Sequence, residues 1–144
     1  MMKNTSVTTV VMLPQSADKV WRALTEKELM SQWLMTTDFE PIPGRAFKLH
    51  GKANRFWRGF VDCRVLEVRK PELLRISWQS IESQRPTEVT YELLERGGGC
   101  ELRVTHSGFD STHGAFSGLV IRVLIRLGLH TELRKKLPLV LATL

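Results

Sequence analysis

The chain has 144 residues, of which 42% are hydrophobic and 25% charged, and it carries a net charge of +6. We expect one folded domain over residues 1–144, because this length supports a single core and the composition excludes a largely disordered chain. The basic residues are dispersed and condense only at Arg134, Lys135 and Lys136. The net charge could suggest nucleic acid or an anionic membrane surface as a partner. Since a short basic run also complements a helix C-terminus, we favour a solvated helix face and expect no nucleic-acid partner.

The first predicted elements are a strand and two short helices. Threonine and valine over 5–13 favour a half-buried strand, which Pro14 closes. Ser16 is a predicted N-cap for a helix over 17–24, whose apolar residues share one face. Thr25 and Glu28 have the spacing of a capping box, which predicts a second helix over 26–32.

From residue 38 onwards the apolar period becomes that of strands. Alternation predicts strands over 46–50, 57–68, 74–79, 88–95 and 100–106, with the second of them bent or bulged. The run Gly97-Gly98-Gly99 predicts a tight hairpin, because glycine readily adopts the positive φ that such turns need.

The C-terminal stretch 116–141 has apolar residues at helical spacing, and Gly128 is expected to kink or divide the helix. We expect the strands to cover this apolar stripe, because burying apolar surface stabilises the fold by about 25 cal/mol per Å². We expect no membrane span, because Arg122 and Arg126 interrupt an apolar run shorter than the roughly 20 residues required. The element order predicts an antiparallel α+β domain.

Six short motifs follow one another in an order that is similar to one known family. They are Val-Trp-Arg-Ala-Leu-Thr at 20–25, Gln-Trp-Leu at 32–34, Pro-Gly-Arg-Ala-Phe at 43–47, Leu-Arg-Ile-Ser-Trp at 74–78, Thr-Glu-Val-Thr-Tyr-Glu-Leu at 87–93 and Leu-Arg-Val-Thr-His-Ser-Gly-Phe at 102–109. In register, they resemble the Hsp90-ATPase-activator-homologue branch of the START-like (Bet v 1-like, SRPBCC) superfamily over nearly the whole chain.

The resemblance implies a helix-grip fold. In that fold a curved antiparallel sheet of about six to seven strands wraps a long C-terminal helix, and two short helices follow the first strand. An apolar cavity lies between sheet and helix. Members of the superfamily include lipid and hormone carriers, cyclases and co-chaperone domains, so the fold alone does not select a function.

Large aromatic side chains are the first candidates for lining that cavity. Trp57 and Trp78 could orient a ligand through their indole N–H groups, and Tyr91 through its hydroxyl, whereas Trp21 and Trp33 are assigned to the core. The complete predicted ligand-binding set is Phe39, Trp57, Trp78, Tyr91, His106, Val123 and Leu127.

His106 is the most informative titratable residue, because it shares the inward register of Leu102 and Val104. It is either a structural hydrogen-bonding residue or the acid or base of a cyclase- or dehydratase-type enzyme. A general base needs a group that orients it, and Asp62 and Asp110 are the carboxylate candidates, neither with diagnostic spacing.

Neither Cys63 nor Cys100 has a histidine or cysteine near it at metal-ligand spacing. We therefore expect no metal, no cofactor and two free thiols in a cytoplasmic protein. The preferred function is non-catalytic binding of a small hydrophobic molecule. Two alternatives stay open: an enzyme that uses His106, and a co-chaperone-like domain that binds a protein partner or forms a homodimer.

Overall fold

The structure is a computed structural model that describes residues 6–82, 85–108 and 131–144. Seven strands form one antiparallel sheet in the order β1-β7-β6-β5-β4-β3-β2. The strands are β1 Ser6–Leu13, β2 Thr36–Thr37, β3 Ala46–His50, β4 Phe60–Arg69, β5 Leu73–Trp78, β6 Thr87–Arg96 and β7 Gly99–Ser107. The helices are α1 Ala17–Thr25, α2 Lys27–Trp33, one π-helical turn η2 Glu132–Lys136 and α4 Leu137–Leu141.

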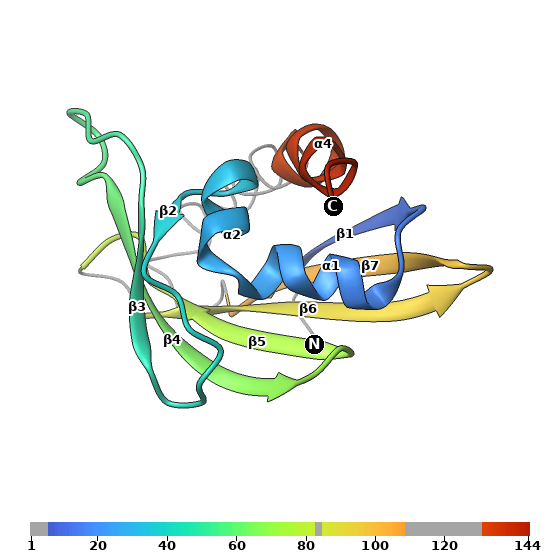
Figure 1. The fold of residues 1–144 in the computed structure, drawn as a ribbon. Helices are drawn as coiled ribbons and strands as arrows, with labels where there is room; N and C mark the ends of the chain where they lie inside the picture. The colour runs from blue at the N-terminus through green and yellow to red at the C-terminus, as the bar shows by residue number, and fades with distance from the viewer. Residues whose placement is uncertain (1–5, 83–84, 109–130) are drawn as a thin grey trace.

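The sheet is strongly curled, and the helices lie on its concave side. Figure 1 shows β2 and β3 standing steeply against the long β6 and β7, with α1, α2 and α4 above the inner face. The curled antiparallel sheet and the C-terminal helix confirm the predicted helix-grip architecture. The β6–β7 hairpin turns at Gly97 and Gly98, whose φ angles of 55° and 86° are those that the glycine run predicted.

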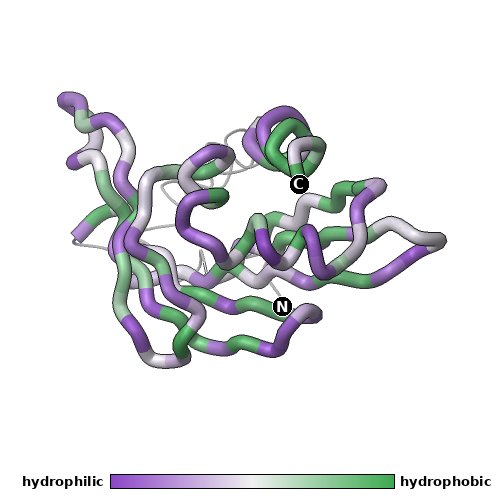
Figure 2. The backbone as a smooth tube through the Cα atoms, in the orientation of Figure 1, coloured by the Kyte–Doolittle hydropathy of each residue, from purple (hydrophilic) through white to green (hydrophobic). Residues whose placement is uncertain are grey.

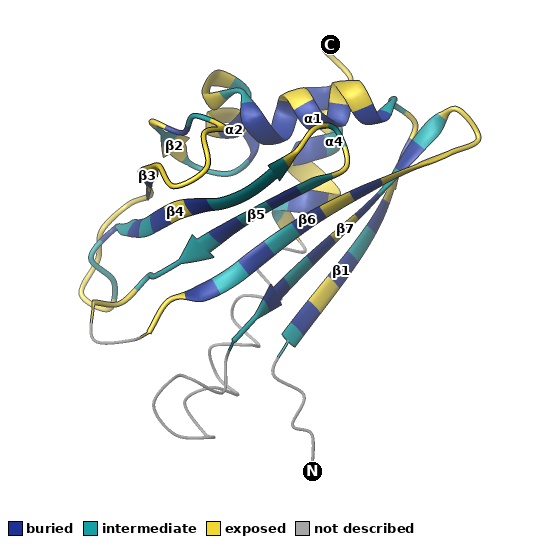
Figure 3. Ribbon diagram, turned by 90° about the horizontal axis from the view of Figure 1, so that it is seen from below, coloured by how far each residue is buried: buried dark blue, intermediate teal, exposed yellow. Residues whose placement is uncertain are grey.

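Each strand of the sheet has one buried and one polar face. Burial alternates along β1, β6 and β7, as the bands of Figure 3 show, and hydropathy alternates with it in Figure 2. On the polar face Arg75 forms ion pairs with Glu67 and Glu88. The inner face is apolar and forms one continuous core with the helices, so hydrophobic burial holds the two layers together.

The two N-terminal helices are joined by one buried tryptophan. Trp33 is 1% exposed, and its indole N–H donates to the carbonyl of Ala23 at 2.8 Å. The Ser16 hydroxyl caps α1 as predicted, accepting from the backbone N–H of Lys19. This arrangement fixes α2 against α1 and closes one end of the inner layer.

The predicted capping box of α2 is wrong. Helix α1 continues through Thr25, and the Thr25 hydroxyl donates to the carbonyl of Trp21 at 2.7 Å. The N-cap position of α2 is Glu26, which makes no side-chain capping bond. A residue in the last turn of one helix cannot adopt the extended backbone that an N-cap requires.

The described part of the C-terminal helix packs on α1 and α2 through buried Leu133, Leu137, Val140 and Leu141. The guanidinium of Arg134 donates to the backbone carbonyl of Val10 on β1 at 2.8 Å. The remainder of the predicted 116–141 helix, including Gly128, lies largely outside the described residues. Over the described part of the chain, no helix has the length and apolarity needed to cross a membrane.

The middle of the sheet departs from regular pairing at two places. A register shift between Val65 and Glu67 bends β4, which confirms the predicted bulge. The two-residue strand β2 was not predicted. Beside it, side chains take over the pairing of β3: the Thr37 hydroxyl donates to the Lys48 carbonyl at 2.7 Å, and Asp38 accepts from the Lys48 N–H at 3.0 Å.

Candidate functional site

A buried polar cluster lies where β5, β6 and β7 meet at one end of the sheet. Thr87 is the first residue of β6 and pairs with Trp78, the last residue of β5. The Thr87 hydroxyl oxygen lies 2.5 Å from Nε2 of His106, which is fully buried. The rings of Trp78 and His106 meet edge to face, with centroids 5.5 Å apart. Two predicted site residues are therefore in direct contact.

Thr87 is the hydrogen-bond partner of His106. Its hydroxyl lies within hydrogen-bonding distance of the backbone carbonyl of Trp78, at 3.2 Å, as well as of Nε2 of His106. Because the hydroxyl has one proton, it donates either to the carbonyl, with Nε2 protonated, or to Nε2 itself. Burial lowers the pKa of His106 from 6.5 to about 4. The imidazole is therefore neutral at pH 7.

These properties bear on the two predicted roles of His106. A neutral imidazole with a pKa of about 4 is a weak base, and its Nε2 is already hydrogen-bonded to Thr87. Asp62 is held elsewhere by bonds to Lys48 and Arg58, which keep the pKa of its carboxyl low. Asp110, the other carboxylate candidate, lies outside the described residues. This geometry favours a hydrogen-bonding role for His106 over acid–base chemistry.

Tyr91 lies on the same inward face of β6 as Thr87 and is 3% exposed. Burial, together with the neighbouring Cys63 thiol, raises the pKa of its phenol. Tyr91 is therefore protonated over the physiological range and stays a neutral hydroxyl. The polar groups that the described sheet directs inward here are uncharged at pH 7.

Trp57 lies in the turn between β3 and β4, not on a strand as predicted. Its six-membered ring packs so closely on Gly51 that a Cβ there would lie 2.7 Å from it. Its Nε1 is buried, and no acceptor among the described residues reaches it. The indole N–H is thus a donor available to a bound molecule.

The other predicted lining residues divide into two groups. Phe39 is 1% exposed and stacks edge to face on Phe47, with centroids 4.9 Å apart, so the structure places it in the core beneath β3. Val123 and Leu127 lie outside the described residues. Thr87 was missed by the sequence analysis, although its register with Val89 and Tyr91 would have directed its hydroxyl inward.

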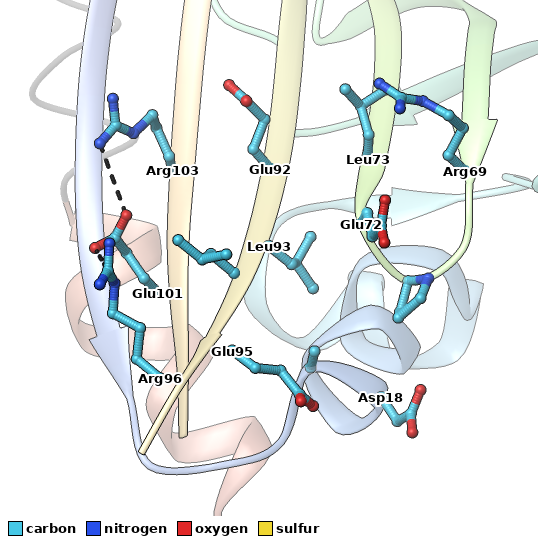
Figure 4. Close-up of a pocket in the computed structure, with 13 residues that line it drawn as sticks. Asp18, Arg69, Glu72, Leu73, Glu92, Leu93, Glu95, Arg96, Glu101 and Arg103 are labelled. Carbon is cyan, nitrogen blue, oxygen red and sulfur yellow. Dashed lines mark hydrogen bonds and ion pairs between the residues drawn. The ribbon is translucent and has the colours of Figure 1, made fainter. Parts of the chain in front are cut away.

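A polar hollow lies elsewhere among the described residues. This open hollow has a volume of about 830 Å³ and lies beside the start of α1 and the ends of the two hairpins. Figure 4 shows charged side chains along it, among them Glu72, Glu95 and Arg103. Glu101 bridges Arg96 and Arg103 there. None of the predicted site residues lines it, and its charged walls do not suit an apolar ligand.

The described thiols, imidazoles and carboxylates were compared with the requirements of a metal site. In residues 6–82, 85–108 and 131–144, no cluster of three or more His, Cys, Asp and Glu side chains could hold an ion. Cys63 and Cys100 are buried free thiols, and burial raises the pKa of both. Neither is a reactive thiolate at neutral pH.

Comparison with known proteins identifies the relatives of this chain. The model of a family described as "Activator of Hsp90 ATPase homolog 1-like protein" matches residues 14–135. The chain belongs to this family. The match agrees with the resemblance carried by the six sequence motifs. Among curated proteins, none matches the chain.

Solved structures related to this Hsp90-activator-like chain share its fold. Protein MLL2253 from Mesorhizobium loti is 25% identical with a TM-score of 0.80, over 96% of this chain and 97% of that one. Bacillus halodurans protein BH1534 is 24% identical with a TM-score of 0.77, over 98% and 99% of the two chains. CalU16 from Micromonospora echinospora is 20% identical with a TM-score of 0.67, over 96% and 82%. The family's fold is one of ligand-binding or activator-type domains.

Proposed function

We propose that the chain binds a small hydrophobic molecule between the concave face of the sheet and the C-terminal helix, without transforming it. The observation that carries this proposal is the Trp78–Thr87–His106 cluster on the inward face of the sheet. An apolar cleft with a few fixed polar groups is the usual form of a small-molecule site, because burial supplies affinity and the polar groups set orientation. Tyr91 lies on the same face and is a further candidate for orienting the ligand.

The indole of Trp57 supports the proposal and narrows the ligand. A buried N–H without an acceptor costs about 1–3 kcal/mol, which a ligand oxygen would recover. His106 and Tyr91 are both neutral at pH 7, so they favour an uncharged partner. The proposed ligand is therefore a mainly apolar, uncharged molecule with at least one oxygen acceptor.

Native mass spectrometry of protein purified from its own host tests the proposal. We expect an adduct of a small molecule that is released on unfolding. Replacing Trp57 by phenylalanine keeps an aromatic ring at this position and removes the donor, so we expect affinity for the extracted molecule to fall about tenfold. The matched control is Trp21→Phe, because Trp21 is a buried indole assigned to the core. Absence of any adduct, or equal losses in both variants, would contradict this function.

A second candidate function is stimulation of a chaperone ATPase, which the name of the matched family suggests. It predicts that the purified domain raises the ATPase rate of an Hsp90-type chaperone from the same host in a saturable manner. Under the ligand-binding proposal the rate is unchanged. The experiment therefore separates the two functions. The ATPase rate of the chaperone alone, without added domain, is its baseline.

A further inference from the structure

The turn between β3 and β4 presents one aromatic side chain to solvent. Phe56 is 88% exposed, while the next residue, Trp57, is directed inward and packs against the core. The hairpin that bears this turn projects from the curled end of the sheet, at the upper left of Figure 1. Phe56 is the most exposed of the large hydrophobic side chains among the described residues, so its ring is fully accessible to a partner.

Hydrogen bonds within the turn define its backbone conformation. The side-chain oxygen of Asn54 accepts from the backbone N–H groups of Phe56 at 2.8 Å and Trp57 at 3.0 Å. The backbone N–H of Asn54 donates to the Trp57 carbonyl at 2.9 Å, and that of Gly51 donates to Gly59 at 2.7 Å. These bonds hold the phenyl ring outward while the neighbouring indole anchors the turn.

The charges around the tip are all positive. Residues 51–59 contain Lys52, Arg55 and Arg58 and no acidic residue. Arg58 is bound to Asp62 and to the carbonyl of Gln79. Lys52 and Arg55 are exposed, and neither forms an ion pair with any described residue. The tip therefore combines one outward aromatic ring with two cations that have no acidic partner among the described residues. The Arg55 guanidinium lies over the Phe56 ring, 6.0 Å from its centroid.

We propose that this turn docks the protein on an anionic lipid surface. Phe56 would enter the boundary between head groups and acyl chains, and Lys52 and Arg55 would contact the head-group phosphates. A lipid surface suits the tip better than a protein does. Lipids can rearrange around a single ring on a narrow charged turn, so no preformed pocket is needed. A protein partner would instead need a matching pocket within an interface of roughly 800 Å² per side.

Sedimentation with vesicles tests this docking and does not depend on the pocket. The probe is vesicles of phosphatidylcholine with phosphatidylglycerol, compared with vesicles of phosphatidylcholine alone. We expect preferential binding to the anionic vesicles, a loss of about fivefold for Lys52→Gln and again for Arg55→Gln, and about tenfold for Phe56→Ala. Phe56→Trp should restore binding, because tryptophan favours the membrane interface.

Matched controls come from the C-terminal helix. Leu139 is 70% exposed and Lys135 is exposed on the C-terminal helix, so Leu139→Ala and Lys135→Gln remove the same kinds of group elsewhere. Equal binding to both vesicle types, or control losses as large as those at the turn, would overturn the proposal. So would binding to an immobilised acidic protein with no binding to vesicles. A failed ligand search would leave this result unaffected.

Discussion

Acidification from pH 7 to pH 4.5 is expected to reduce the free energy of unfolding by about 2 kcal/mol through His106 alone. The pKa of His106 is about 4 in the fold, against 6.5 ordinarily. The unfolded chain therefore takes up a proton as the pH falls below 6.5, while the folded chain does so only near 4. The contribution of the neutral imidazole is complete above pH 6.5 and is lost progressively down to about pH 4.

Urea unfolding of the wild type and of His106→Gln at the two pH values measures this effect. Glutamine does not titrate and still offers an N–H to Thr87, so its stability should change less between the two pH values, by about 2 kcal/mol. Other titrating groups act on both proteins and cancel in the comparison. Parallel pH dependence in the two proteins would show that His106 does not titrate as its burial requires.

Truncation of Trp33 is expected to have the largest effect of any single change discussed for this protein. Trp33→Ala should lower the free energy of unfolding by about 3–5 kcal/mol, because it opens a cavity between α1 and α2 and removes a hydrogen bond. Trp33 is 1% exposed, and its N–H is the donor to the Ala23 carbonyl. Chemical denaturation monitored by far-ultraviolet circular dichroism measures the loss.

Trp33→Phe is the matched control for that experiment. It keeps most of the ring volume and removes the donor, so we expect a loss of about 1–3 kcal/mol from the unsatisfied Ala23 carbonyl and the smaller ring. The difference between the two variants reports packing alone. Equal losses for phenylalanine and alanine would mean that packing at this position contributes little.

Most of the fold could be predicted because hydrophobic period and turn chemistry are local signals. The alternation of Val89, Tyr91 and Leu93 defines the inward face of β6, and the glycines after it define the hairpin. The capping box and β2 failed for different reasons. Thr25 had the spacing of a cap but was needed by the preceding helix, and β2 is too short to show any period.

The candidate site was predicted in part. Trp78 and His106 were both expected, but sequence spacing cannot bring the end of β5 beside the end of β7, because their contact depends on the pairing of three strands. Thr87 was missed for the same reason. Trp57 was expected on a strand, whereas Asn54 closes a turn there through its side chain, a bond that no hydrophobic pattern reveals.

The side-chain bonds to the Lys48 backbone have a consequence for how this protein meets copies of itself. A sheet normally ends in open backbone groups that can recruit a foreign strand, as happens in domain swapping and in fibril growth. On β3, the Thr37 hydroxyl already occupies the carbonyl of Lys48, and the Asp38 carboxylate occupies its N–H. These two short polar side chains therefore remove the Lys48 backbone groups from those that a foreign strand could pair with.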